Sequence, residues 1–130
     1  MELHVYKNTT LREVKAQFSR YFPFLKLEFF VYPYPAGEGA HLNREVYKGL
    51  YVDETSGFFK EGVINFSPST TITELEQAFQ IELGLAAKVF RMSTDSWIDT
   101  TQTSHLNLGR QNNIGAAVSR PQFNLHTLFL

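Results

Sequence analysis

The sequence predicts an α+β fold, a two-layer sandwich in which two helices cover one face of a β-sheet. The prediction rests on an internal repeat, on the same helix-start pattern in both copies, and on strand patterns that flank each helix. The repeat relates residues 9–18, TTLREVKAQF, to residues 70–79, TTITELEQAF. Because the two stretches share apolar as well as polar positions, we expect both to adopt the same local structure.

Each copy of the repeat begins with the pattern of a helix N-terminus. Thr10 and Glu13 have the spacing of a capping box, and so do Thr71 and Glu74. In a capping box the Thr hydroxyl and the Glu carboxylate each accept a hydrogen bond from a backbone N–H that has no partner within the helix. Two helices are therefore expected to start at matching points of the repeat.

The spacing of apolar residues predicts helices over residues 10–22 and 71–83. Pro23 follows the first helix and Gly84 the second, and both residue types are common where helices end. The back of each predicted helix is polar, so each helix is expected to lie on a sheet with one buried face. The apolar positions recur every three or four residues: Leu11, Val14, Phe18 and Phe22 in the first helix, and Ile72, Leu75, Phe79 and Leu83 in the second.

Strand patterns precede and follow each helix. Two strand–helix–strand units result, residues 3–32 and 63–92, and the helix in each unit lets its flanking strands run parallel. Together they predict the β-α-β-β-α-β plan of a ferredoxin-like fold with both helices on one sheet face. The strands are expected at residues 3–7, 25–32, 63–66 and 87–92.

A single domain is expected to include all 130 residues. Residues 33–61 form an insert between the two units, and residues 93–130 add an extra C-terminal hairpin, a turn and an apolar tail. Within this last region, residues 97–100 are expected to pair with strand 87–92, and residues 101–113 to form a short helical turn. A second fold stays open, because the order of elements in residues 62–108 also resembles the latter part of a ubiquitin-like β-grasp domain.

Composition excludes several chemistries and partners. Lys and Arg number 12 against 13 Asp and Glu, so no basic field would attract a phosphate backbone, and we do not expect nucleic acid as the main partner. The absence of cysteine excludes disulfides, thiolate nucleophiles and Cys-based metal sites. The N-terminus lacks the pattern of a signal peptide, and no apolar run approaches the ~20 residues that span a bilayer. We therefore expect a cytoplasmic protein with no membrane partner.

No catalytic residue, cofactor or metal site is predicted. The four histidines lack the spacing of metal ligands, and Asp95 is explained more simply as a turn residue, with Asp99 in solvent beside it, than as one of a catalytic pair. Gly37 and Gly39 do not open a helix, as a phosphate-binding loop would. Whether the chain is an enzyme stays open, and the residues favour the answer that it is not.

Three stretches resemble a family of small uncharacterised Bacteroidetes proteins. They are KLEFF at 26–30, GVINFSPSTTITELEQAF at 62–79 and WIDTTQTSHLNLGRQNN at 97–113. Leu106 departs from the family pattern, which has an aromatic residue there. The resemblance implies a small bacterial cytoplasmic protein and brings no activity, cofactor or site with it. The residues that match the pattern after the hairpin are Thr100, Thr101, Thr103, Leu108, Gln111 and Asn112.

Exposed aromatic residues predict an interaction surface. If the odd-numbered residues of strand 25–32 face the helices, then Phe30 and Tyr32 point to the open face of the sheet, where Tyr6 of the first strand can join them. Tyr47 belongs to the insert that could close over this face. Trp97 is the only tryptophan; we favour it as a cover for the edge of the core, with an interface residue as the alternative.

These features predict a non-enzymatic protein-interaction module or a subunit of a larger assembly, with another protein as its partner. The first alternative is a small-molecule-binding protein or enzyme with a pocket between the sheet and the 33–61 insert, lined by Phe30, Tyr32 and Tyr47. The second is RNA binding by stacking on the exposed sheet aromatics. The open face must also be covered, either by the insert and the tail at 123–130 or by a second copy in a homodimer.

Overall fold

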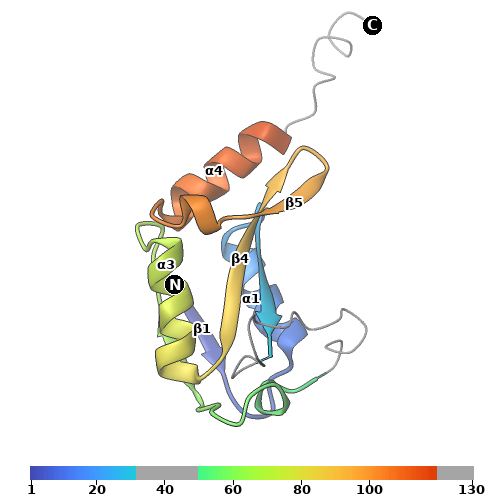
Figure 1. The fold of residues 1–130 in the computed structure, drawn as a ribbon, viewed down its shortest axis with the longest axis vertical. Coiled ribbons are helices and arrows are strands. Elements are labelled where there is room, and N and C mark those ends of the chain that lie inside the picture. The colour runs from blue at the N-terminus through green and yellow to red at the C-terminus, as the bar shows by residue number, and fades with distance from the viewer. Residues whose placement is uncertain (32–49, 120–130) are drawn as a thin grey trace, which may run out of the picture.

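The computed structural model describes residues 1–31 and 50–119, which form an α+β fold (Figure 1). The predicted class is therefore confirmed, and each predicted helix and strand of the two repeat units is present. Expectations for Tyr32, Tyr47, most of the insert and the tail lie outside the described residues. In chain order the elements are β1 (Glu2–Val5), α1 (Leu11–Tyr21), β2 (Leu25–Phe30), the 3₁₀ turn η1 (Val52–Glu54), β3 (Gly62–Asn65), α3 (Ile72–Ala78), the π-helical turn η2 (Phe79–Leu83), β4 (Ala86–Ser93), β5 (Ser96–Asp99), the 3₁₀ turn η3 (Thr101–Thr103) and α4 (Leu108–Ser119).

The described strands form two antiparallel sheets instead of one. β1 pairs with β3, so that Leu3 lies opposite Ile64. The other sheet has the order β2-β4-β5, with Leu27 opposite Val89. A ferredoxin-like fold would place all four repeat strands in one sheet. The ferredoxin-like topology is therefore not confirmed, and the β-grasp topology is not confirmed either. Strand pairing depends on contacts between residues far apart in the chain, which the alternation within each strand does not specify.

Both repeat helices begin at the predicted residues, but only the second shows both hydrogen bonds of the predicted capping box. The Thr71 hydroxyl accepts a hydrogen bond from the backbone N–H of Glu74 at 3.1 Å, and the Glu74 carboxylate accepts one from the backbone N–H of Thr71 at 2.8 Å. Hydrogen bonds from Thr71 to this carboxylate, first of all the one from its backbone N–H, hold the pKa of Glu74 below its usual value. In α1 the Thr10 hydroxyl accepts from the backbone N–H of Glu13 at 3.2 Å. The second helix continues through η2 to Gly84, whose left-handed backbone (φ 67°) ends it.

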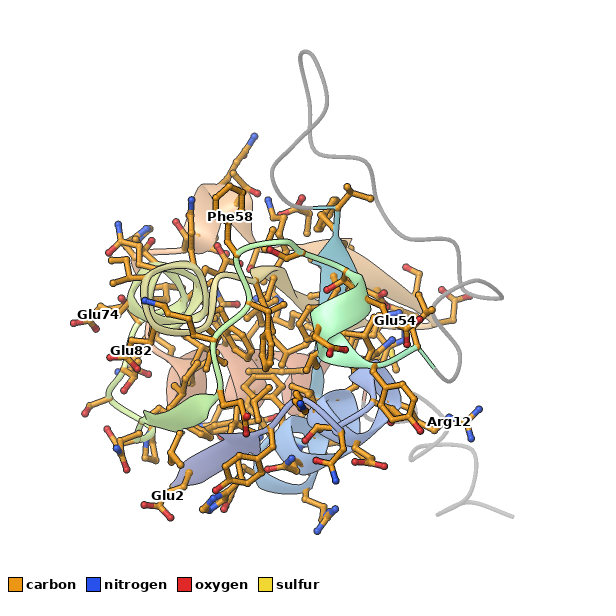
Figure 2. All side chains as sticks on the ribbon, turned by 90° about the horizontal axis from the view of Figure 1, so that it is seen from below. Glu2, Arg12, Glu54, Phe58, Glu74 and Glu82 are labelled. Atoms are coloured by element: carbon orange, nitrogen blue, oxygen red, sulfur yellow. The ribbon has the colours of Figure 1, made fainter. Side chains whose placement is uncertain are left out.

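One hydrophobic core joins both sheets to α1 and α3. The equivalent residues of the repeat, Phe18 and Phe79, are both fully buried. The Phe18 ring centroid lies 6.3 Å from that of Phe66, and the Phe79 centroid 6.0 Å from that of Phe29. Alternate residues of β2, from Leu25 to Phe29, face this core together with both helices, as the repeat predicts. Charged side chains such as Glu2, Arg12 and Glu74 point away from the packed interior (Figure 2).

The region predicted to form a short helical turn, residues 101–113, contains the 3₁₀ turn η3 and the first half of a third helix, α4, which extends to Ser119. Helix α4 packs on β4 and β2. Gly115 contacts Phe24 and the side chain of Arg91. Because Arg91 is paired with buried Leu25, its side chain is on the core face of the sheet, and α4 therefore lies on that face. The buried residues of α4 are Leu108, Gln111 and Gly115. Only one of these is a large apolar residue, which is why apolar spacing did not predict the helix.

Replacing Gly115 by Ala is expected to destabilise the protein by about 1–3 kcal/mol, because the site has no room for a methyl group. A Cβ there would lie 2.9 Å from the Cβ of Phe24 and 3.1 Å from its carbonyl oxygen. In an open helix the same change would stabilise by about 1 kcal/mol. Urea unfolding followed by circular dichroism measures the difference. Ala117→Gly on the exposed side of α4 should cost only the helix propensity, again about 1 kcal/mol. A Gly115→Ala protein as stable as the wild type would contradict this close packing.

Candidate functional site

The outer face of the β2-β4-β5 sheet carries a group of aromatic and charged side chains. Residues paired across antiparallel strands share a face, so the register places Lys26, Phe90 and Asp99 in one row and Met92 and Trp97 in the next. We call these five residues the Trp97 surface. Asp99 is exposed and the other four are half-buried. The helices α1, α3 and α4 all pack against the opposite face, so no described helix covers this surface.

Lys26 connects the aromatic and charged parts of the Trp97 surface. Its Nζ lies 4.9 Å from the centroid of the Trp97 ring, within the range of a cation–π contact. The same Nζ lies 3.1 Å from Oε1 of Glu28, and Nζ of Lys15 lies 3.2 Å from that oxygen. Burial raises the pKa of Glu28, but the two ammonium groups outweigh it and bring that pKa below its usual value. The ammonium group over Trp97 is therefore held by a carboxylate that stays charged near neutral pH.

A second ion pair lies at the edge of the Trp97 surface. Nζ of Lys88 lies 3.3 Å from Oδ2 of Asp99 and donates a hydrogen bond to the Thr101 hydroxyl. The backbone N–H of Thr101 donates to Oδ1 of Asp99 at 2.7 Å. Burial raises the pKa of Asp99, and the hydrogen bonds from Thr101 and the charge of Lys88 more than offset this, so the pKa is lowered. The sequence reading had Asp99 in solvent, and the structure adds this partner.

The structure separates the described aromatic residues of the predicted interaction surface. Phe30 and Trp97 share the outer face but lie near opposite ends of β4, since Phe30 pairs with Ala86 and Trp97 with Met92. Tyr6 follows β1 in the other sheet, where its ring lies beside that of His4. Tyr32 and Tyr47 lie outside the described residues. The residues that surround Trp97 are instead Lys26, Phe90, Met92 and Asp99.

The Thr and Gln-Asn pattern after the hairpin attaches α4 to the sheet. The Thr100 hydroxyl donates to the Val89 carbonyl at 2.7 Å, and Nε2 of Gln111 donates to the carbonyl and hydroxyl oxygens of Thr103, each at 2.8 Å. Oδ1 of Asn112 accepts from the backbone N–H of Phe24 at 2.8 Å. Thr100 and Gln111 are almost completely buried. These hydrogen bonds hold the start of β2, the turn at Thr103 and α4 in place.

Several cavities border helices of the described residues, among them one of about 330 Å³ beside α1, lined by Gln17, Arg20 and Tyr21. A cavity of about 660 Å³ borders the outer side of α4 and the turn at Pro68, where its polar lining includes Asn107, Arg110 and Asn113. A cavity of about 240 Å³ lies between α3 and the first half of β4. Within residues 1–31 and 50–119, no three His, Asp or Glu side chains gather closely enough to hold a metal ion.

Glu76 borders the cavity between α3 and β4. Its Oε2 accepts a hydrogen bond from the backbone N–H of Val89 at 2.9 Å. Burial raises the pKa of Glu76 above its ordinary value of 4.5, and the nearby charge of Asp99 adds to this effect. The hydrogen bond from Val89 and the charge of Lys88 offset the increase only in part. Sequence reasoning did not single out Glu76, because nothing in its local pattern indicates that it contacts a strand.

Replacing Glu76 by Gln is expected to raise the melting temperature near neutral pH. Because the pKa of Glu76 is raised in the folded state, its charged form destabilises the fold. This destabilisation is complete at pH values above the folded-state pKa and absent at pH values below the unfolded-state pKa near 4.5. Gln keeps an oxygen for the Val89 N–H and removes the charge. The advantage should therefore shrink as the pH falls and vanish below about 4. Thermal unfolding across this range measures it, with Glu82→Gln at an exposed site as the control. A constant difference at all pH values would contradict the assignment.

No family model, curated protein or solved structure matches this chain. The resemblance to a Bacteroidetes family therefore stays a prediction, and the site is interpreted from its own geometry. None of the helices in the described ranges is long and apolar enough to cross a membrane.

Proposed function

We propose that this chain is a non-enzymatic protein-interaction module that binds a partner protein through the Trp97 surface. The observation that carries the proposal is the position of Trp97, the only tryptophan, on a sheet face that no described helix covers. Tryptophan is among the residues that most often dominate binding energy at interfaces. Methionine, phenylalanine and tryptophan are all enriched at the centres of such interfaces, and charged residues at their rims.

The arrangement around Trp97 is suited to binding a protein. Lys26 is paired with Glu28 and contacts the Trp97 ring, so its side chain would lose little freedom on binding. Lys26 and Asp99 lie on either side of Phe90 and would orient a partner by their opposite charges. The hydrogen-bonded Thr, Gln and Asn side chains of the region hold the fold together, which supports a non-enzymatic role.

The alternative of a small-molecule pocket against the 33–61 insert depends mainly on residues outside those described. Its predicted lining residues Tyr32 and Tyr47 belong to that part of the chain. The Trp97 surface carries the more specific proposal, because its geometry is known residue by residue.

The test is affinity purification of the tagged full-length chain from the organism that encodes it, followed by mass spectrometry. Trp97→Ala is compared with Tyr51→Ala, which removes an exposed aromatic ring away from the Trp97 surface. We expect a protein that the wild type and the Tyr51→Ala variant retain and that binds Trp97→Ala about tenfold or more weakly. Sedimentation of the purified chain shows whether that protein is a second copy.

Three results would contradict the proposal. The first is that no protein is retained, and the second is that Trp97→Ala retains the same proteins as the wild type. The third is that nuclease treatment removes the bound material, because the partner would then be a nucleic acid. Circular dichroism must show that Trp97→Ala is folded, and Lys26→Glu, which reverses the charge beside the ring and keeps Trp97, gives a second variant that is checked for folding in the same way.

A further inference from the structure

Strand β4 is paired along only half of one edge. On one side β2 pairs with Ala86–Arg91, whereas on the other side β5 pairs only with Phe90–Ser93. The first half of β4 therefore has no strand beside it on the β5 side within the described part of the chain. An unpaired strand edge presents backbone N–H and C=O groups that can bind another extended chain.

The backbone groups that no neighbouring strand pairs with belong to Val89 and Ala87. The N–H of Val89 donates to Glu76 and its C=O accepts from Thr100, so both groups point away from β2. Backbone groups of residues two apart in a strand point to the same side, so the N–H and C=O of Ala87 also point away from β2. Among residues 1–31 and 50–119, neither group of Ala87 has a hydrogen-bond partner from outside the sheet.

The side chains of Glu76 and Thr100 occupy the places that a neighbouring strand would fill at Val89. A carboxylate oxygen from α3 stands where a strand carbonyl would accept, and a hydroxyl stands where a strand N–H would donate. Two residues earlier in the strand, at Ala87, the corresponding places adjoin the cavity of about 240 Å³. At roughly 30 Å³ for each water, this cavity has room for several waters or for a short length of extended chain.

Helix α3 forms the opposite wall of this cavity and is polar there. Thr73, Gln77 and Gln80 line the wall, and Ala86, Ala87 and Lys88 line the strand side. The small side chains of Ala86 and Ala87 leave the strand edge open to the cavity. Ala87 is itself only 7% exposed, so its polar groups lie at the bottom of the groove, where unpaired groups are unfavourable.

We propose that the groove between α3 and β4 binds an extended, polar peptide segment of a partner protein, which adds to β4 as a strand. The backbone of the peptide pairs with Ala87, and its side chains contact the amide and hydroxyl groups of α3. This mode of recognition takes its affinity from main-chain hydrogen bonds and its specificity from the side chains on the wall. The inference rests on the proposed function in that the ligand is a protein, but it uses a site separate from Trp97.

The experiment selects ligands from a library of random short peptides displayed on phage, with the full-length chain as the target. Selected peptides are synthesised and added to the chain while amide NMR spectra are recorded. We expect the largest shifts at the amides of Ala87 and Val89, and slower hydrogen exchange at Ala87 in the complex. Gln77→Trp, which fills the groove from its exposed wall, should weaken binding about tenfold or more, because the backbone pair can no longer form.

Ile81→Trp is the matched control, because Ile81 is on the continuation of the same helix and 71% exposed but does not line the cavity. It should leave the affinity unchanged. If the selected peptides shift the NMR signals of residues around Trp97, and Trp97→Ala abolishes their binding, the groove is not the peptide site. That result would still support the proposed function. Failure to select any peptide, or slow exchange of the Ala87 amide already in the free protein, would also overturn the groove as the peptide site. Retention of a partner by affinity purification tests the proposed function independently.

Discussion

Replacing Phe79 by Ala is expected to lower the free energy of unfolding by about 3–5 kcal/mol. The side chain is fully buried and its ring lies against Phe29 at a centroid distance of 6.0 Å, so its loss leaves a cavity between helix and sheet. Phe18 has the equivalent place in the repeat and is equally buried, and Phe18→Ala should cost a similar amount. Domains are commonly stable by about 5–15 kcal/mol, so either change removes a large share of the total.

Urea unfolding at equilibrium measures both variants. Ile81→Ala, on the turn after Phe79 and 71% exposed, should stay within about 0.5 kcal/mol of the wild type. If Phe79→Ala were destabilising and Phe18→Ala were not, the two repeat helices would not share one core. A loss below about 1 kcal/mol for both would contradict their central position.

The change Gly84→Ala should destabilise the protein by about 2–5 kcal/mol. Two causes add. Gly84 has a left-handed backbone with φ 67°, which a residue with a Cβ adopts at a cost. In addition, a Cβ at this position would lie 2.1 Å from the carbonyl oxygen of Phe58, so the backbone of one segment would have to move.

Gly57→Ala is a direct control for the loss of a glycine in the same region. A Cβ at Gly57 meets no atom within 4 Å, and its φ is not positive, so the change should alter stability by less than about 1 kcal/mol. Thermal and urea unfolding of the two variants are compared. Equal stability of both would mean that the end of η2 can take another conformation, contrary to the tight contact with Phe58.

The repeat helices could be predicted because their signals are local. The capping pairs Thr10 with Glu13 and Thr71 with Glu74 lie three residues apart, and the apolar spacing extends over only a few turns. The structure places Phe18 and Phe79 in the core, as the periodicity indicates, and ends the second helix at Gly84. The same local alternation located the five strands of the described residues to within one or two residues.

The pairing of the strands could not be predicted in the same way. β1 with β3, and β2 with β4, bring together segments separated by many residues, and several pairings bury the same alternating faces. The right-handed crossover rule assumes that the two strands of each unit belong to one sheet. In this protein the strands of each unit belong to different sheets, so the rule does not apply.

Helix α4 was not predicted because polar contacts and close approach hold it in place. Its buried face consists of Leu108, Gln111 and Gly115, a set with little apolar periodicity. Gln111 binds Thr103, and Asn112 binds the backbone of Phe24, a residue on a distant part of the chain. Such contacts depend on the finished fold and leave no pattern in the sequence.

The candidate site was predicted in part. Phe30 and Trp97 lie on one sheet face, in agreement with the alternation of their strands, but Tyr6 follows the end of β1, a strand of the other sheet. The neighbours of Trp97, above all Lys26 and Phe90, come from strands whose register only the structure provides. Glu76 and the half-paired edge of β4 depend on the same register, so sequence reasoning had no means of finding them.

Fluorine NMR of the full-length chain labelled with fluorotryptophan tests the central claim most directly. Trp97 is the only tryptophan, so the labelled chain has one signal, and an unlabelled partner adds none. With the partner protein from affinity purification, we expect that signal to shift or broaden in proportion to the complex that sedimentation detects. Lys26→Glu should weaken the response, because it reverses the charge beside the ring. An unchanged signal while sedimentation shows a complex would mean that the partner binds elsewhere, which contradicts the Trp97 surface as the binding site.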